Sequence, residues 1–493
     1  MEFDLKCTLL FNKSLNDAQE TLTDFVQETN RYNPKKFQIQ SWTIEDNKLS
    51  LHLLSRDDIR AHTYLLQLKK KLDTLLGRTH HLGLRSLKLD DYHILFDLDT
   101  IPLEEINIPF AQIDIKKRAV SLHIQDKDEE FLTQNYIDRM INLVREKAHF
   151  QIYRGKKEDW KLLWRSPQKK PLWFKDPTEV LSTLGWIEQG PTKGKWFFRP
   201  PAAAIMRAMA QIAIEKILQP LHFQEVISSM HVPLTTWLKT GHLQGMPGEI
   251  YYISEPATRD VKKWETFIDL LKIKKEIPIK EFSQMVSIPQ AGICYAQCPN
   301  IYWSFSGKTI AESSLPLLLY DRSVPSARYE SGGRHGIERV DEFHRIEIVY
   351  IGTKEQLLDI KEKLIEKYRM VFNEIMDLEW RMAQVTPFYL QQAGQIVEEE
   401  SSAGTIDFEA WLPYRGDRDT PWLELHNVSI VGEKYIRAFN IKTQKSTLWS
   451  GCSGIGLERW TTAFLAQKGI DPQKWSPSFQ KFLSDFPSSP EFL

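Results

Sequence analysis

The chain has 493 residues, of which 42% are hydrophobic, and this is enough for two or three domains with substantial cores. Its formal net charge of -1 excludes a globally basic nucleic-acid-binding protein, so local patches must hold any polyanionic partner. Four cysteines are too few for a disulfide framework and suit a reducing compartment. The acidic N-terminal residues differ from a secretory leader, and no apolar run has the length of a membrane span. We expect a soluble, cytoplasmic protein with no membrane partner.

Residues 1–165 alternate between strand-like and helical patterns. Runs with strand character occupy residues 3–10, 37–42, 49–54, 92–98, 111–115 and 119–124. Helical spacing of apolar residues occupies residues 16–29, 57–76 and 135–148, with Asn16 and Asp57 as candidate caps. The pattern predicts an α+β domain in which helices cover an antiparallel sheet.

Residues 166–493 read as a second, larger domain, and the basic, proline-bearing stretch 154–175 reads as the join. Two short helical patterns, 264–271 and 279–285, predict a helix-turn-helix insertion near residues 255–290. The remaining expected elements are helices over 200–218 and 354–378, and strands at 223–227, 408–412, 422–430 and 435–441. The last strand leads to the glycine-rich segment 451–456.

Alternate residues in an extended strand share a face, so Arg328 and Glu330 point the same way. Phe343, Arg345 and Glu347 form a second row of this kind. One row could hold a nucleotide and the other a second substrate. An isolated Arg-x-Glu pair is usually a surface ion pair, but the spaced set of residues favours a binding site for ATP.

Residues 327–347 and 450–460 resemble the second and third signatures of the class II aminoacyl-tRNA synthetases, most closely the atypical seryl-tRNA synthetases of methanogenic archaea. Short segments beginning at Thr240, Ala296 and Trp411 fit the same branch. The resemblance covers residues 165–480, whereas the N-terminal part shares only length and layout. It implies an antiparallel catalytic sheet flanked by helices, preceded in the chain by an α+β tRNA-binding domain.

The resemblance implies roles for five residues around ATP. Arg328 would contact both the α-phosphate and the carboxylate of the amino acid, through paired hydrogen bonds that lysine could not reproduce. Glu330 would accept a hydrogen bond from the adenine amino group, and Phe343 would stack on the base. Arg459 would hold the other side of the nucleotide, and Arg339 would lie near the triphosphate tail.

The same resemblance implies a zinc site made by Cys298, Glu347 and Cys452. Their spacing alone would not suggest a metal, and without the family context the two cysteines read as core residues. Two thiolates and a carboxylate are competent zinc ligands and leave a fourth position open, which the serine amino group would take from a water. Zinc would then recognise the amine rather than activate a nucleophile.

The resemblance also implies roles for residues whose sequence context is less distinctive. Glu424 would hold magnesium on the α- and β-phosphates, with Asn427 near it, although an acidic residue on a late strand is often simply solvated. Glu409 would face the bound serine. Gly454 and Gly456 would let the backbone approach the adenosine closely.

Basic residues near one end of an expected N-terminal helix are the candidate tRNA contacts: Lys69, Lys70, Lys71, Arg78 and Arg85. The family reads the long variable arm of tRNA(Ser) with its N-terminal domain, whereas charge alone also fits a solvated helix face. A homodimer is implied as well. The first class signature departs from its usual form, with Ser228 and Ser229 near the expected proline.

We predict a seryl-tRNA synthetase that activates serine with ATP and transfers it to tRNA(Ser), with Zn²⁺ and Mg²⁺ as cofactors. One alternative is an amino acid ligase that charges a carrier protein, which would not need the N-terminal domain. The other is a non-catalytic synthetase paralogue that binds amino acid or tRNA. The joint presence of Arg328, Glu330, Phe343 and Arg459 argues against a loss of catalysis.

Overall fold

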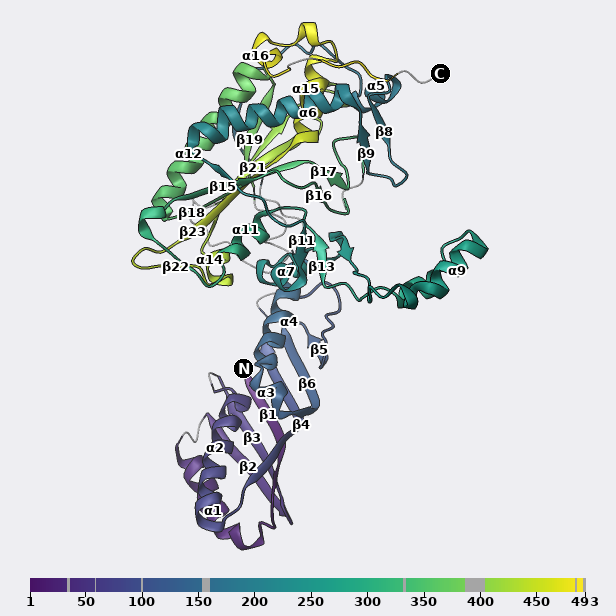
Figure 1. Ribbon diagram of the computed structural model, residues 1–493. Coiled ribbons are helices and arrows are strands. Elements are labelled where there is room, and N and C mark those ends of the chain that lie inside the picture. Colours follow the sequence, from purple (N-terminus) through teal and green to yellow (C-terminus); the bar gives the residue numbers. More distant parts are fainter. Residues whose placement is uncertain are drawn as a thin grey trace. The chain divides into compact units, whose positions relative to one another are not determined.

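The computed structural model describes residues 1–32, 36–57, 59–98, 101–152, 160–330, 334–385, 404–483 and 486–490. The chain divides into two compact units, Met1–Lys157 and Glu158–Leu493 (Figure 1). Residues 153–159 of the expected join, and residues 331–333 of the second signature, lie outside the described ranges. Within those ranges, no helix combines the length and apolar character needed to cross a membrane.

The N-terminal unit is built on one antiparallel sheet with the strand order β2-β3-β1-β4-β6-β5. Its strands are β1 (Glu2–Phe11), β2 (Phe37–Glu45), β3 (Lys48–Arg56), β4 (Leu84–Asp97), β5 (Gln112–Lys116) and β6 (Ala119–Asp128). All six predicted strands are confirmed. In β1 the residues Phe3, Leu5, Cys7, Leu9 and Phe11 are buried in alternation, so one face of the sheet carries the core.

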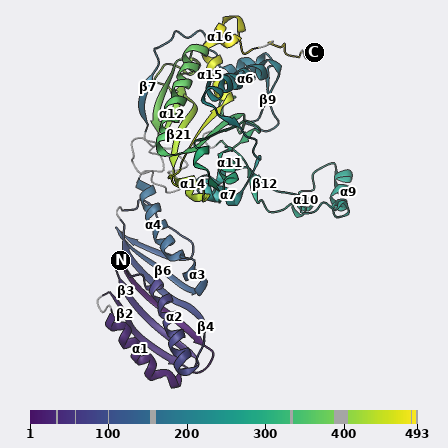
Figure 2. The same cartoon turned by 60° about the vertical axis from the view of Figure 1, so that its left-hand side comes forward.

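Helices cover that apolar face (Figure 2): α1 (Gln19–Tyr32), α2 (Ala61–His80), α3 (Glu129–Thr133) and α4 (Tyr136–Ile152). In α2 the residues Leu65, Leu68, Leu72 and Leu76 are buried at helical spacing. The expected caps are wrong. The N-cap of α2 is Arg60 without a side-chain bond, and Asp57 instead adopts a left-handed turn conformation with φ 61°. A 3-10 turn begins at Asn16, ahead of α1.

The C-terminal unit contains a sheet with the order β10-β15-β18-β23-β21-β20-β19-β7, antiparallel except at β10–β15. Its strands are β7 (Lys161–Arg165), β10 (Gln224–Glu225), β15 (Leu317–Asp321), β18 (Arg345–Gly352), β19 (Trp380–Val385), β20 (Thr405–Ala410), β21 (Leu423–Gly432) and β23 (Trp449–Gly456). Because β7 pairs with β19, this unit begins before residue 165, where we had placed the boundary.

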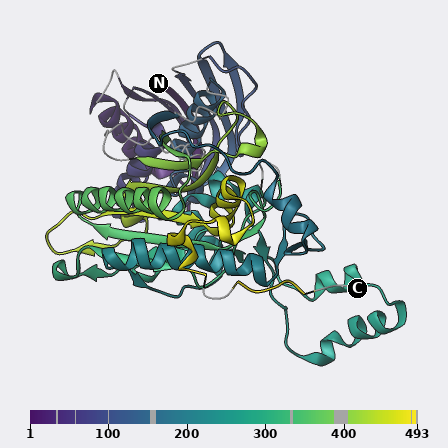
Figure 3. The same ribbon diagram turned by 90° about the horizontal axis from the view of Figure 1, so that it is seen from above.

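Three helices pack on one face of this sheet: α6 (Pro200–Ala213), α12 (Lys354–Met370) and α15 (Leu457–Lys468). Figure 3 shows α6 and α12 running along the sheet. Proline occupies the first turn of α6, and a capping box between Thr353 and Gln356 starts α12. In β18 the residues Ile346, Ile348 and Tyr350 point into this helical core, which leaves Arg345 and Glu347 for the opposite face.

The predicted strand over residues 435–441 is wrong. The segment contains the short helix α14 (Lys434–Ala438) and then the two-residue strand β22 (Lys442–Thr443). Tyr435, Ile436 and Phe439 are all buried in a second core with Tyr302, whose ring centroid lies 4.9 Å from that of Tyr435. Apolar residues three and four apart fit a helix turn, and the run was too short to show that period.

Two short helices, α9 (Glu265–Lys274) and α10 (Ile279–Gln284), occupy the expected insertion. They contact each other through Phe267 and Phe282, whose ring centroids are 5.7 Å apart. The strand expected at residues 223–227 is reduced to the two residues of β10.

Candidate active site

A cavity of the C-terminal unit, on the face of the sheet opposite α6, α12 and α15, gathers most of the predicted site residues. Nine of them line it: Cys298, Arg328, Glu330, Phe343, Glu347, Glu424, Asn427, Cys452 and Arg459. They come from segments that are up to 161 residues apart along the chain, counted from Cys298 to Arg459. Gly454 and Gly456 line the same cavity.

Strand alternation and one bulge explain which residues face the cavity. In β23, Cys452, Gly454 and Gly456 are two residues apart and share a face. In β21, Glu424 and Asn427 are three apart, which regular alternation would place on opposite faces. Glu424 pairs with Glu409 and His426 pairs with Phe408 on β20, so Leu425 has no partner and forms a β-bulge. The extra residue brings Glu424 and Asn427 to the same face of the sheet.

Arg328 is held between two carboxylates. Its Nη2 donates to Oε2 of Glu330 at 3.0 Å, and its Nε lies 3.4 Å from Oε2 of Glu249. Burial alone would lower the pKa of Arg328, but the charges of Glu330 and Glu249 outweigh burial and raise that pKa. The contact shows that Arg328 and Glu330 point the same way, although the strand before them, β16 (Ser326–Ala327), ends at residue 327.

Asp341 fixes the backbone that carries this pair. The backbone N–H of Glu330 donates to Oδ1 of Asp341 at 3.1 Å, and the N–H of Arg328 donates to the Asp341 carbonyl at 2.8 Å. Burial would raise the pKa of Asp341, but hydrogen bonds from Arg334 and Tyr251 hold it below its ordinary value. Asp341 is therefore a charged anchor beneath Arg328 and Glu330.

Arg459, in the first turn of α15, pairs with Glu424 on β21. Its Nη1 lies 3.0 Å from Oε2 of Glu424 and 3.1 Å from the backbone oxygen of the same residue. The neighbouring Glu458 accepts from the backbone N–H of His344 at 2.9 Å and contacts its Nδ1 at 2.7 Å. The start of α15 is thereby tied to the residue that follows Phe343.

Cys298, Glu347 and Cys452 all line this cavity. Cys298 is the first residue of α11 (Cys298–Ser304), Glu347 lies in β18, and Cys452 lies in β23 opposite Val349. Burial raises the pKa of Glu347. The charge of Arg345 and the contact with Cys298 lower that pKa, but by less. The pKa of Cys298 is raised by its contact with Cys452, by burial and by the charge of Glu347.

The chemistry of this trio fits a metal. Glu347 is fully buried, and no group among the described residues donates a hydrogen bond to either of its carboxylate oxygens. Arg345 Nε lies 2.6 Å from Oε2 as an ion pair, without hydrogen-bond angles. Two buried thiols and an unsatisfied buried carboxylate form a donor set suited to zinc. Their ligand atoms do not all lie within 4.8 Å of one another across the described residues, so binding would draw them together.

Two predicted residues are not among the described residues that line the cavity. Glu409 accepts from Trp160 Nε1 at 3.1 Å and pairs with Arg381 Nε at 2.5 Å. These contacts occupy its carboxylate. Arg339 exchanges two backbone hydrogen bonds of 3.0 Å with His335 in a tight loop.

The cavity also contains residues to which we assigned no role from the sequence. Arg345 pairs with Glu347, and its position two residues before Glu347 on one strand was the available signal. His242 is buried in the cavity wall, where burial lowers its pKa to about 3, helped by the charges of Lys434 and Arg345. Glu249, which reaches Arg328, has no local pattern that would reveal it.

The predicted tRNA contacts lie on and after α2. Lys70, Lys71, Arg78 and Arg85 are exposed to solvent. Lys69 is less exposed and forms an ion pair with Glu129 of α3. Four of the five predicted tRNA contacts are therefore exposed basic side chains, and the fifth, Lys69, is already in an ion pair.

Comparison with known proteins relates both units to established families. Residues 1–146 match the model of a tRNA-binding domain, and residues 293–468 match that of the tRNA synthetase class II core domain (G, H, P, S and T). The second match contains all nine of the predicted site residues that line the cavity.

Relatives match the chain along its whole length. The type-2 serine–tRNA ligase of Methanococcoides burtonii is 40% identical, and that of Methanothrix thermoacetophila is 39% identical, each over 100% of both chains. A crystal structure of M. kandleri SerRS in complex with A. aeolicus tRNASec superposes with a TM-score of 0.85 at 26% identity. It covers 100% of this chain and 99% of that one. The chain therefore belongs to the family of type-2 serine–tRNA ligases, with a tRNA-binding domain followed along the chain by a class II synthetase core.

Proposed function

We propose that the cavity binds ATP and serine together, joins them as seryl-adenylate, and passes the seryl group to the terminal ribose of tRNA(Ser). The observation that carries the proposal is the convergence of nine site residues, from segments far apart in the chain, on one cavity. A set of unrelated surface ion pairs would be scattered over the sheet. The family to which the chain belongs supports the same activity.

In the first step the serine carboxylate attacks the α-phosphorus, and pyrophosphate leaves. Two anions must approach each other, so a fixed cation between them lowers the barrier. Arg328 has this role, because Glu249 and Glu330 hold its guanidinium group in the cavity. Glu330 and Phe343 hold the adenine, and Arg459 holds the phosphates at the other side.

Glu424 and Asn427 would hold Mg²⁺ on the phosphates, where the ion offsets negative charge. Glu424 also positions Arg459 at 3.0 Å, so one carboxylate serves two cations. Cys298, Glu347 and Cys452 would hold Zn²⁺, which supplies an open position for the serine amino group. Arg345 keeps the carboxylate of Glu347 in place through its ion pair.

In the second step a hydroxyl of the terminal ribose attacks the seryl carbonyl, and AMP leaves. The N-terminal unit would hold the tRNA, with Lys70, Lys71, Arg78 and Arg85 as exposed contacts for backbone phosphates and Lys69 as a weaker contact. We also propose that the enzyme is a cytoplasmic homodimer. Glu409 and Arg339 do not line the cavity among the described residues, and their contacts with serine and with the triphosphate stay predictions.

Serine-dependent exchange of pyrophosphate into ATP tests the first step, and charging of tRNA(Ser) tests the second. Arg328→Lys should lose exchange, since an ammonium group cannot bridge two anions as a guanidinium does. Arg322→Lys is the matched control, because Arg322 forms an exposed pair with Glu225 away from the cavity. Equal activity in the two variants would refute the assignment. Exchange without tRNA charging in the unmodified enzyme would favour a carrier-protein ligase, and no exchange would favour a non-catalytic paralogue.

A further inference from the structure

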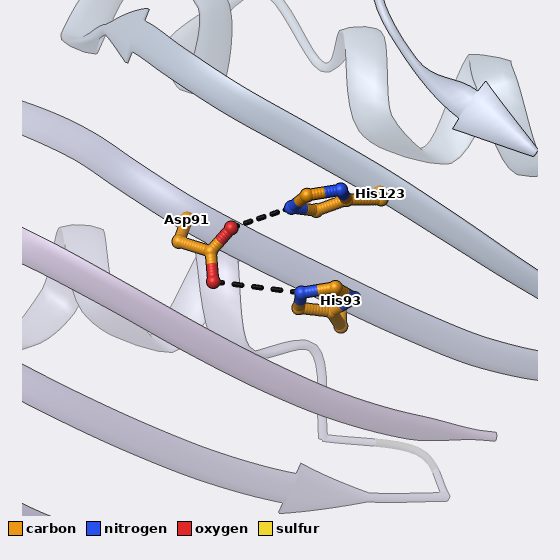
Figure 4. A group of neighbouring side chains, drawn as sticks. All are labelled: Asp91, His93 and His123. Carbon is orange, nitrogen blue, oxygen red and sulfur yellow. Dashed lines mark hydrogen bonds and ion pairs between the residues drawn. The ribbon is translucent and has the colours of Figure 1, made fainter.

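The polar face of the N-terminal sheet carries a compact cluster of two imidazoles and a carboxylate. Asp91 and His93 lie in β4, and His123 lies in the neighbouring strand β6 (Figure 4). His123 Nε2 is 2.5 Å from Asp91 Oδ1, and His93 Nε2 is 3.5 Å from Asp91 Oδ2. Both rings thus direct a nitrogen at the same carboxylate, one at each oxygen.

Strand register fixes this arrangement. His93 and His123 are direct partners across the β4–β6 ladder, and Asp91 is two residues before His93 on the same face. The residues between and beside them, Tyr92 and Ile124, are buried in the core on the other face. Since β4 lies between β1 and β6, and β6 lies between β4 and β5, both strands that carry the three side chains are paired on both sides.

The ligand atoms of these three residues all lie within 4.8 Å of one another, and no other group of three His, Cys, Asp or Glu side chains in the described part of the chain does so. The imidazole rings stack with centroids 4.0 Å apart and planes 10° apart. Nearly parallel rings direct their nitrogen lone pairs along parallel lines, so both rings would have to tilt toward a shared ion to reach the usual zinc–nitrogen distance of about 2.1 Å.

We propose that Asp91, His93 and His123 bind one divalent transition-metal ion of the zinc class, with the remaining position open to water. Two imidazoles select borderline ions such as Zn²⁺, Co²⁺ or Ni²⁺ over Mg²⁺ and Ca²⁺, which prefer oxygen ligands.

Two neighbours sharpen the proposal. Lys6 Nζ lies 4.0 Å from Asp91 Oδ2. The positive charge of Lys6 would therefore repel a metal ion bound at the Asp91 carboxylate and weaken its binding. The same face carries a simple His–Asp pair: His52 Nε2 lies 2.7 Å from Asp4 Oδ1, and no third His, Cys, Asp or Glu among the described residues completes a ligand group with them. His52 and Asp4 therefore serve as an internal comparison for a pair that binds no metal.

Zinc titration of the full-length protein by calorimetry tests the site. Wild type should bind one more equivalent of Zn²⁺ than His93→Ala or His123→Ala, while His52→Ala should bind as much as wild type. Any zinc bound elsewhere is common to all variants and cancels in the difference. Circular dichroism spectra that match wild type would exclude a loss of fold. Co²⁺ in place of Zn²⁺ should give a visible absorption band that the His123→Ala variant reduces.

Lys6→Ala should raise the affinity for zinc, whereas the histidine substitutions should lower it. A loss of fold could not produce a higher affinity. Removing a cation about 4 Å from the carboxylate should tighten zinc binding about threefold to tenfold at low salt. The proposal is overturned if His93→Ala and His123→Ala bind as many zinc ions as wild type with the same affinity. It is also overturned if His52→Ala loses as much zinc as His123→Ala, or if Lys6→Ala leaves the affinity unchanged.

Discussion

Gly454 leaves open the space that the guanidinium group of Arg345 occupies. A Cβ atom on Gly454 would lie 1.8 Å from Arg345 Nη2 and 2.2 Å from its Cζ. Gly454 is also the direct partner of Glu347 across the β18–β23 ladder. The absence of a side chain on one strand thus allows the ion pair between Arg345 and Glu347 on the other. We had expected this glycine to admit adenosine, and the structure gives a different steric reason for it.

Gly454→Ala should displace Arg345 and disturb the carboxylate of Glu347. We expect a loss of stability of about 1–3 kcal/mol, typical of an overpacked buried site, together with a raised KM for serine in pyrophosphate exchange. Gly456→Ala is the matched control, since the nearest atom to its Cβ would be 3.8 Å away. Thermal unfolding of both variants measures the difference. Similar melting temperatures for the two would contradict the steric account.

The strands and helices of the N-terminal unit could be predicted because their apolar residues repeat clearly. In β1 five buried residues alternate without a break, and in α2 four buried leucines follow helical spacing. The strand prediction for residues 435–441 was wrong because the segment has too few buried residues to distinguish the period of a helix from that of a strand. Local sequence also cannot give a strand ladder, so the pairing of His93 with His123 was missed although both strands were predicted.

From spacing alone, without the family resemblance, the candidate site could be predicted only where its residues are close in sequence. Arg328 and Glu330 could be paired from their spacing alone. By contrast, Cys298 and Cys452 are brought together by the register of β18 and β23 and by the start of α11, which no spacing reveals. The bulge at Leu425 is a further example, because it decides that Asn427 faces the cavity.

Cys452→Ala should lose bound zinc and most serine-dependent exchange, because the donor set would fall from three ligands to two. Metal content by atomic emission and exchange activity are measured on the same sample. Cys294→Ala is the control, since Cys294 is a buried thiol of the same unit whose sulfur contacts the backbone oxygen of Pro325 at 4.0 Å. Full zinc content in Cys452→Ala would exclude the proposed site.

Glu424→Gln should weaken the binding of magnesium and ATP while leaving serine binding unchanged. The change removes the charge that holds Arg459 and would hold the ion, but it keeps a hydrogen-bond acceptor of the same shape. We expect the KM for ATP to rise about tenfold to a hundredfold, the cost of one or two charged hydrogen bonds. Steady-state exchange at varied Mg²⁺ checks this. Glu433→Gln, in an exposed pair with Arg437, should behave as wild type.

His344 should stabilise the fold more at low pH than at high pH. Its hydrogen bond with Glu458 outweighs partial burial and raises the pKa of His344. The protonated ring is favoured in the folded state, so its stabilising effect is complete below the unfolded pKa of about 6.5 and is lost as pH rises through the folded pKa. The side chain is half exposed, and solvent screening limits the effect to less than about 1 kcal/mol. Unfolding of wild type and His344→Gln at pH 6 and pH 8 should differ more at pH 6, and an equal difference at both would contradict this assignment.

Substitution of the basic residues of α2 should affect tRNA binding according to whether each cation is already paired. Lys70 and Lys71 are exposed and available to phosphates, whereas Lys69 is partly buried against Glu129. Each of Lys70→Ala and Lys71→Ala should weaken tRNA(Ser) binding and reduce the slope of log affinity against log salt by about one, the effect of one lost phosphate contact. Lys69→Ala should change the slope less, because Glu129 already neutralises that charge. Filter binding across a range of salt concentrations measures all three slopes. Equal slopes for wild type, Lys70→Ala and Lys71→Ala would move the tRNA contact to another surface of the N-terminal unit.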